Sequence, residues 1–214
     1  MENTIKIYKK ELKDHVPPRH GFITIHGKKQ AGKDTFATYL SDHLRSKCKT
    51  VKIVAYADKM KQMISEYLSV PRSLLFGNNE DKETLIEHIT WDNMPLHIQE
   101  MYGITSGPMS VREICQVTGT DVFRKMFFDS VWIDATLNQS FANYDYVIIT
   151  DVRLENELRA VETDLKFKIK RNNDIEETIK HETEQGLPDY MFDFIFENNG
   201  TIEDIKSYIR RIFI

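Results

Sequence analysis

Short apolar runs rich in β-branched and aromatic residues alternate along the chain with longer segments whose apolar residues recur at helical spacing. The runs that predict strands are residues 21–26, 50–56, 144–150, 165–170 and 193–197. Several are almost continuously apolar, which is typical of strands covered on both faces. The alternation therefore predicts an α/β fold, with a mainly parallel sheet of about five strands between layers of helices.

Three helices stand out from their spacing and their capping residues. One follows the first strand and carries its apolar face on Phe36, Ala37, Leu40 and Leu44. A second begins at Ser110, whose side chain can form a capping box with Glu113, and Gly119 is expected to end it. The last begins near Thr201 and directs five apolar residues toward the sheet, namely Ile202, Ile205, Tyr208, Ile209 and Ile212.

The domain organisation follows from where these signals are weak. Residues 1–20 are rich in lysine and end at Pro17-Pro18, so they are interpreted as an extension. Residues 58–129 show no strong strand signal and predict a mostly helical insert. Residues 21–214 are therefore expected to form one domain that contains this insert.

Composition narrows the class of protein. The chain has 214 residues, of which 41% are hydrophobic and 29% charged, and a net charge of -4. This charge disfavours a partner with a phosphate backbone, because such proteins usually carry a basic surface. Two cysteines are too few for a disulfide framework, and no apolar stretch approaches the roughly 20 residues needed to span a bilayer. We therefore expect a soluble cytoplasmic protein that binds no nucleic acid and no membrane.

The strongest chemical signal is the segment GKKQAGKDT, which starts at Gly27. It supplies the G-x-x-x-x-G-K pattern between a predicted strand and a predicted helix, as in P-loop nucleotide-binding folds. Glycines let successive N–H groups point at a phosphate at the positive end of the helix, and Lys33 can reach the terminal phosphates. The residues expected to bind the phosphates of ATP are Gly27, Gln30, Ala31, Gly32, Lys33 and Thr35.

The loop departs from the common pattern at one position. Asp34 stands where Ser or Thr usually holds Mg²⁺, and Thr35 follows it. A carboxylate can bind Mg²⁺ directly or through water, and it can equally face the phosphate acceptor. The pattern leaves both interpretations open.

Charged residues after the third strand run are a second candidate group. Asp151 closes this run, where the carboxyl ends of parallel strands bind ligands. It can therefore hold Mg²⁺ or its water shell, or it can be a structural N-cap. Arg153 and Glu157 are four residues apart on the predicted next helix, as a surface ion pair or as part of the site.

The predicted insert offers a third group. Arg112 and Gln116 share a helix face and can clamp an acceptor phosphate and a base edge. Trp132 can stack on a base, although filling the core is the usual role of a tryptophan.

Several segments together resemble the bacteriophage deoxynucleoside monophosphate kinases. They are GKKQAGKDT, SVREICQVTGTDVF, VWID, YVIITDVRLENE, HETEQGLP and FENNGTIEDI. The resemblance implies catalytic roles for Lys33, Asp34, Asp151 and Arg153, with the metal near Thr35, Asp34 and Asp151. It also implies that the acceptor contacts seven residues, namely Arg112, Gln116, Gly119, Thr120, Trp132, Arg153 and Glu157. In this family a basic residue can follow the arginine, whereas this chain has Glu113.

The same resemblance extends to the donor side and to the reaction. A lid-like segment at 171–188 with Arg171, and the turn Asn198-Asn199-Gly200, are expected near the adenine of ATP. The implied reaction is Mg²⁺-dependent phosphorylation of deoxynucleoside monophosphates by ATP, in the cytoplasm of an infected cell if a phage encodes the protein. A homodimer is expected by analogy. The alternatives are a kinase of another phosphorylated metabolite, such as dephospho-coenzyme A, and an ATPase or nucleotide switch.

Overall fold

The computed structural model describes residues 21–28, 30–161, 165–171 and 186–213, which form two compact units. The first, here called the sheet unit, contains the described residues up to Tyr56 and those from Gln139 onward. The second, here called the helical unit, runs from Ala57 to Asn138.

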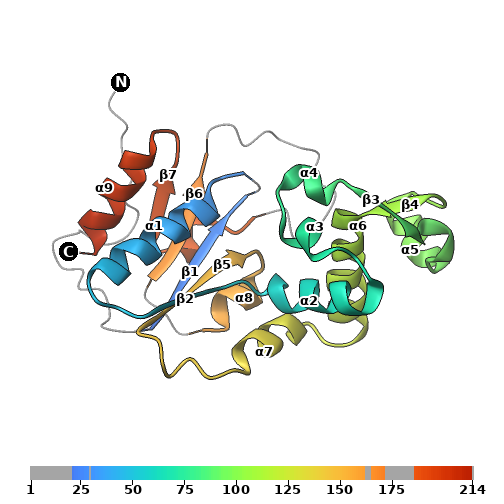
Figure 1. Ribbon diagram of the computed structural model, residues 1–214, viewed down its shortest axis with the longest axis horizontal. Helices are drawn as coiled ribbons and strands as arrows, with labels where there is room; N and C mark the ends of the chain where they lie inside the picture. Colours follow the sequence, from blue (N-terminus) through green and yellow to red (C-terminus); the bar gives the residue numbers. More distant parts are fainter. Residues whose placement is uncertain (1–20, 29, 162–164, 172–185, 214) are drawn as a thin grey trace. The chain divides into compact units, whose positions relative to one another are not determined.

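The sheet unit is built on five parallel strands in the order β2-β5-β1-β6-β7 (Figure 1). The strands are β1 (Gly21–Gly27), β2 (Val51–Val54), β5 (Tyr146–Val152), β6 (Leu165–Lys170) and β7 (Phe194–Glu197). Each coincides with a predicted apolar run, so the predicted α/β class and parallel sheet are confirmed. β1 lies in the middle, which brings the end of β1 beside the ends of β5 and β6.

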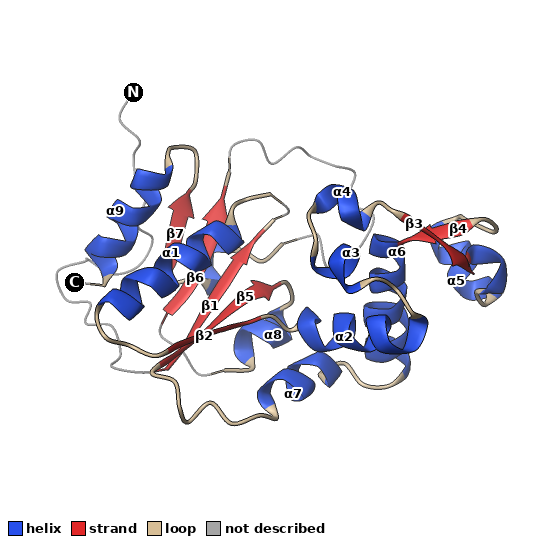
Figure 2. Ribbon diagram, in the orientation of Figure 1, coloured by secondary structure: helices blue, strands red, loops and turns tan. Residues whose placement is uncertain are grey.

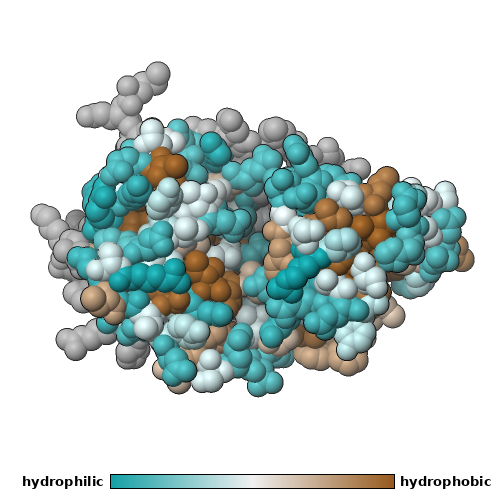
Figure 3. All heavy atoms as spheres, in the orientation of Figure 1, coloured by the Kyte–Doolittle hydropathy of each residue, from teal (hydrophilic) through white to brown (hydrophobic). Residues whose placement is uncertain are grey.

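Helices cover both faces of this sheet. α1 (Lys33–Ser46) connects β1 to β2, and α8 (Glu155–Arg159) connects β5 to β6 in the opposite direction across the sheet. Right-handed crossovers in opposite directions lie on opposite faces. α9 (Ile202–Ile212) packs beside α1, and both present mostly hydrophilic or neutral residues on their outward side (Figures 1 and 3).

The core of the sheet unit lies between the sheet and these two helices. Phe36 is fully buried there against Phe167, Phe196 and Tyr208. Replacing such an aromatic side chain with alanine costs about 3–5 kcal/mol. The predicted faces of both helices are buried except at Ile202, which is 51% exposed because it occupies the first turn of α9. Thr201 caps this helix through a capping box with Asp204.

The helical unit contains a short antiparallel strand pair as well as helices (Figure 2). β3 (Leu85–Thr90) pairs with β4 (Pro108–Ser110), and a strand pair was not predicted. On the inward side of this strand pair, Ile86 and Met109 are buried. With so few buried positions, the alternation of apolar and polar residues along the two strands is weak in the sequence. The other elements are α2 (Ala57–Leu68), α3 (Arg72–Phe76), α4 (Asn79–Lys82), η2 (Trp91–Asn93), α5 (Leu96–Tyr102), α6 (Val111–Gln116), η3 (Val117–Arg124) and α7 (Val131–Leu137).

The predicted start of α6 is confirmed, whereas its predicted end is wrong. Ser110 forms the capping box with Glu113. The chain then continues without a break into the π-helix η3, so Gly119 lies inside a helix. A Cβ at Gly119 would come within 2.3 Å of the sulfur of Met60, so glycine serves close packing at this position.

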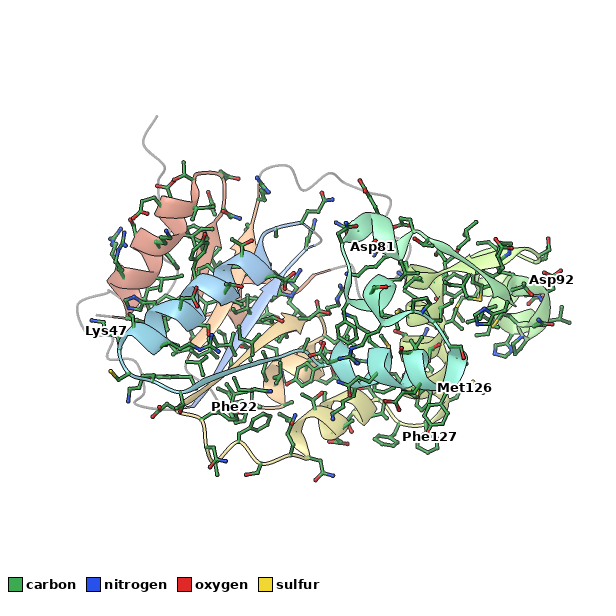
Figure 4. All side chains as sticks on the ribbon, in the orientation of Figure 1. Phe22, Lys47, Asp81, Asp92, Met126 and Phe127 are labelled. Atoms are coloured by element: carbon green, nitrogen blue, oxygen red, sulfur yellow. The ribbon has the colours of Figure 1, made fainter. Side chains whose placement is uncertain are left out.

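The π-helix leads to a short apolar stretch at the surface of the helical unit. Met126 and Phe127 point away from the ribbon (Figure 4), and they are 67% and 73% exposed. Among the described residues, no helix is long and apolar enough to cross a membrane.

Candidate functional site

The phosphate loop connects the end of β1 to the start of α1. Gly32 is the N-cap of α1, with a left-handed φ of 94° that favours glycine. Gln30 also has a positive φ, 62°, which is uncommon for a residue with a side chain. At Gly27 a Cβ would lie 2.6 Å from the carbonyl oxygen of Ile169 on β6. Both glycines of the sequence pattern are therefore required by the backbone.

The last three residues of this loop, Lys33, Asp34 and Thr35, form the first turn of α1. Nζ of Lys33 donates a hydrogen bond of 3.2 Å to the carbonyl oxygen of Lys28, so the ammonium group folds back over the loop. Asp34 and Thr35 are exposed at the positive end of the helix. An anion bound here would meet both the helix terminus and a lysine.

Asp151 lies inside β5, so the N-cap interpretation is wrong. The register between β1 and β5 shifts at this point: Thr24 pairs with Ile149, whereas His26 pairs with Val152. β5 therefore carries one extra residue, a bulge of the kind that re-aims side chains beside functional sites. Asp151 Oδ1 accepts a 3.1 Å hydrogen bond from Nε of Arg153, which fixes the direction of the guanidinium group.

Glu157 does not lie at the surface, where the ion-pair interpretation of the sequence placed it. Its side chain is buried, and Oε2 accepts hydrogen bonds from the N–H groups of Arg153 (2.6 Å) and Leu154 (3.1 Å). The Tyr56 hydroxyl donates to the carbonyl oxygen of Glu157 at 3.1 Å. Glu157 thus holds the turn after β5, and with it the backbone of Arg153.

His26, directly before the loop, was missed in the sequence. Its Nδ1 lies 2.8 Å from the carbonyl oxygen of Val152, and Nε2 accepts from the N–H of Leu187 at 3.3 Å. A carbonyl can only accept, so Nδ1 carries the proton and the ring is neutral. Burial, together with the positive charges of Lys168, Lys33 and Arg153, lowers the pKa of His26 to about 4. The feature of the sequence that could have identified His26 is its position directly before Gly27.

The described parts of the predicted lid-like segment are its two ends. Arg171 is exposed and directly follows β6. Directly after the other end, Asp189 in the short helix η5 (Asp189–Met191) forms ion pairs with Lys168 and Lys170 of β6. Residues 172–185 lie outside the described part of the chain.

The turn after β7 contacts the phosphate loop directly. Nδ2 of the buried Asn198 donates a 2.8 Å hydrogen bond to the carbonyl oxygen of Ala31. Asn199 and Gly200 are exposed.

In the helical unit, Arg112 is held by a carboxylate that the sequence pattern did not indicate. Its Nε donates to Oε1 of Glu83 at 2.7 Å. Its Nη2 is buried and has no hydrogen-bond partner among the described residues. A buried guanidinium donor without a partner is costly, and a phosphate oxygen is the acceptor that such a group binds best. Glu113 caps its own helix through Ser110, and Gln116 is half-buried on α6.

The remaining expected acceptor residues pack together in the same unit. Trp132 is buried, and its Nε1 donates to the carbonyl oxygen of Gly119 at 2.9 Å. Its ring centroid lies 5.0 Å from that of Phe123. Thr120 is buried beside them in η3. Trp132 therefore fills the core of the helical unit and supports the π-helix, rather than presenting a free face to a base.

The oxygen atoms available to a metal are few. Among residues 21–28, 30–161, 165–171 and 186–213, no group of three or more His, Cys, Asp or Glu side chains could hold a metal ion. Asp34, Thr35 and Asp151 offer oxygen donors only, the type that Mg²⁺ prefers. Mg²⁺ commonly takes one or two protein ligands and completes its shell with waters and phosphates.

Comparison with known proteins points to one family. The model of the family described as deoxynucleotide monophosphate kinase matches residues 52–209. A protein of Escherichia phage RB69 named deoxynucleotide monophosphate kinase is 30% identical over 110 residues, which cover 48% of this chain and 44% of the phage protein. A protein of the same name from Enterobacteria phage T4 is 30% identical over 108 residues, or 47% and 44% of the two chains.

These matches cover only part of this chain and part of each relative. The aligned segments span less than half of each curated relative, 44% in both cases. The family match begins at Lys52, after the phosphate loop. The loop is thus an independent observation, carried by its own sequence pattern and backbone geometry.

Proposed function

Since this chain belongs to the deoxynucleotide monophosphate kinase family, we propose that it transfers the γ-phosphate of ATP to deoxynucleoside monophosphates. The observation that carries the proposal is the phosphate loop between β1 and α1, with Gly32 at the helix N-cap and Lys33 over the loop. This loop lies outside the matched residues 52–209 and supports the same activity independently.

In the proposed reaction, an oxygen of the acceptor phosphate attacks the γ-phosphorus of ATP. The bond from that phosphorus to the β–γ bridging oxygen breaks, and the products are ADP and a deoxynucleoside diphosphate. Backbone N–H groups of the loop and Lys33 hold the donor phosphates. The protein contributes mainly positioning and charge neutralisation in such reactions.

Two arginines are proposed to bind the acceptor phosphate. The ion pair with Asp151 orients Arg153, and the carboxylate of Glu157 holds its backbone. In the helical unit, Glu83 holds Nε of Arg112, while the buried Nη2 supplies a hydrogen-bond donor. Gln116, Gly119 and Thr120 are proposed to line the acceptor side, with Trp132 supporting them from the core.

Mg²⁺ is the proposed cofactor, with Asp34, Thr35 and Asp151 as candidate oxygen ligands, directly or through water. When bound, it neutralises charge on the donor phosphates. Asp34 is proposed chiefly to orient the acceptor, because Thr35 and Asp151 supply other oxygens for the ion. Arg171, Asn199 and Gly200 are proposed to border the adenine. A homodimer in the cytoplasm of the host cell is proposed by analogy with phage relatives.

The experiment that tests the proposal is a panel of deoxy- and ribonucleoside monophosphates incubated with ATP and Mg²⁺. Formation of deoxynucleoside diphosphates, with one ADP released for each, is expected. ATP hydrolysis without an acceptor would favour an ATPase instead. Turnover of dephospho-coenzyme A alone would favour the other kinase class.

A further inference from the structure

The side chain of Asn198 is turned toward the phosphate loop. It projects from the turn after β7, and its Nδ2 donates to the carbonyl oxygen of Ala31 at 2.8 Å in a buried environment. The backbone of this turn is fixed too, because the N–H of Asn198 donates to the carbonyl oxygen of Lys170 at 2.7 Å. A side chain on a fixed turn can hold the carbonyl that it binds.

Holding this carbonyl fixes a second group. The described chain contains no cis peptide bond, so the oxygen of Ala31 and the N–H of Gly32 point in opposite directions from one rigid plane. With the oxygen bound to Asn198, the N–H of Gly32 is directed away from it. Among the described residues, no group accepts a hydrogen bond from this N–H. It is left as a donor for a ligand, at the N-cap of α1.

The glycine itself is explained by the same contact. A Cβ at position 32 would lie 2.3 Å from Nδ2 of Asn198, closer than any real contact. The left-handed φ of 94° would allow few other residues, and the amide of Asn198 occupies the remaining space. Gly32 and Asn198 therefore form a matched pair, although 166 positions separate them in the sequence.

We propose that Asn198 is a positioning residue that orients the Ala31–Gly32 peptide so that the Gly32 N–H points at a phosphate of the bound nucleotide. This inference rests on the proposed function only as far as nucleotide binding. It differs from a contact with adenine, because the amide of Asn198 is buried against the loop. The ligand class that it serves is any Mg²⁺-bound polyphosphate.

The test measures equilibrium binding without an acceptor, for two probes: ATP and inorganic tripolyphosphate, each with Mg²⁺. Asn198→Asp replaces the donor with an oxygen that repels the Ala31 carbonyl, and Asn198→Ala removes the contact without that repulsion. Asn198→Asp should weaken both probes at least ~10-fold, in line with the loss of an oriented charge-assisted hydrogen bond. Asn198→Ala should weaken both to a smaller extent.

Asn143→Asp is the matched control, since Asn143 is exposed in the segment that leads into the opposite end of β5. It should bind both probes as the wild type does. A loss confined to ATP would mean an adenine contact and would overturn the proposal. Unchanged binding of both probes by a folded Asn198→Ala, checked by circular dichroism, would also overturn it. If the wild type binds ATP but phosphorylates no monophosphate, the proposed function fails while this test still applies.

Discussion

His26 and Val152 are joined across the β1–β5 pair by a 2.8 Å hydrogen bond between Nδ1 and the carbonyl oxygen. The bond links the residue before the phosphate loop to the residue between Asp151 and Arg153. Nε2 of the same ring accepts from the N–H of Leu187. One neutral imidazole therefore links three segments. The bond from the N–H of Leu187 depends on the ring staying neutral, because a protonated Nε2 cannot accept, whereas Nδ1 donates to the Val152 carbonyl in either state.

Acid should weaken this arrangement. Burial and neighbouring cations lower the pKa of His26 from 6.5 to about 4 in the folded protein, so the unfolded chain binds the proton more readily. The free energy of unfolding should fall as the pH drops from about 6.5 to 4, by on the order of 3 kcal/mol from this group, and change no further below that range.

Urea unfolding of the wild type and His26→Asn across this pH range measures the effect. Asparagine does not titrate and can still donate to the Val152 carbonyl, so the variant should lose much of the pH dependence. An unchanged slope between pH 6.5 and 4 would contradict the assigned neutral state.

Lys33→Ala should lower kcat by at least ~10²-fold, because a preorganised positive charge at the donor phosphates stabilises the transition state. The fold should survive, because the Lys33 side chain is only half-buried at the start of α1 and its ammonium group donates to a loop carbonyl. Lys47→Ala is the control at the other end of α1 (Figure 4), where the side chain is exposed. Near-normal turnover in a folded Lys33→Ala would remove the phosphate-loop assignment.

Arg112→Lys should raise KM for the acceptor much more than KM for ATP. Lysine cannot keep the bond to Glu83 and also present a second donor in a fixed direction, whereas the guanidinium group does both. Arg210→Lys, an exposed arginine paired with Glu203, should change neither constant. An effect confined to ATP would move Arg112 to the donor side.

The alternation of apolar runs predicted all five strands of the parallel sheet, because strands buried on both faces have a strong local signal. It did not predict β3 and β4, whose ribbon buries few side chains. The sequence predicts a helix end at Gly119, because a rule based on neighbouring residues cannot detect the packing of Met60 against this glycine.

The candidate site was predictable where it is local in sequence. The phosphate loop is one contiguous segment, and the spacing of its glycines and lysine indicates its backbone conformation. The carboxylate of Glu157 binds backbone N–H groups three and four positions before it, which its spacing from Arg153 did not reveal. The bond of Arg112 to Glu83 and the contact of Asn198 with Ala31 join residues 29 and 167 positions apart, so no local spacing rule could indicate either pair.

Asp34→Ser tests the position at which the loop departs from the common pattern. If Asp34 orients the acceptor, the variant should bind ATP and Mg²⁺ almost normally and show a sharply lower single-turnover rate. Thr35 directly follows it and remains available as a hydroxyl ligand. Loss of Mg²⁺-dependent ATP binding, with the transfer rate preserved at saturating metal, would make Asp34 a metal ligand instead.

The activity proposed for this chain is direct phosphoryl transfer from ATP to a deoxynucleoside monophosphate. The most direct measurement follows γ-³²P from labelled ATP into products separated by chromatography, with each deoxynucleoside monophosphate in turn. We expect label in the β-phosphate of a deoxynucleoside diphosphate, in equal amount to the ADP formed, and formed at least ~10²-fold more slowly by Lys33→Ala. Label released only as inorganic phosphate, at a rate that no monophosphate changes, would contradict it.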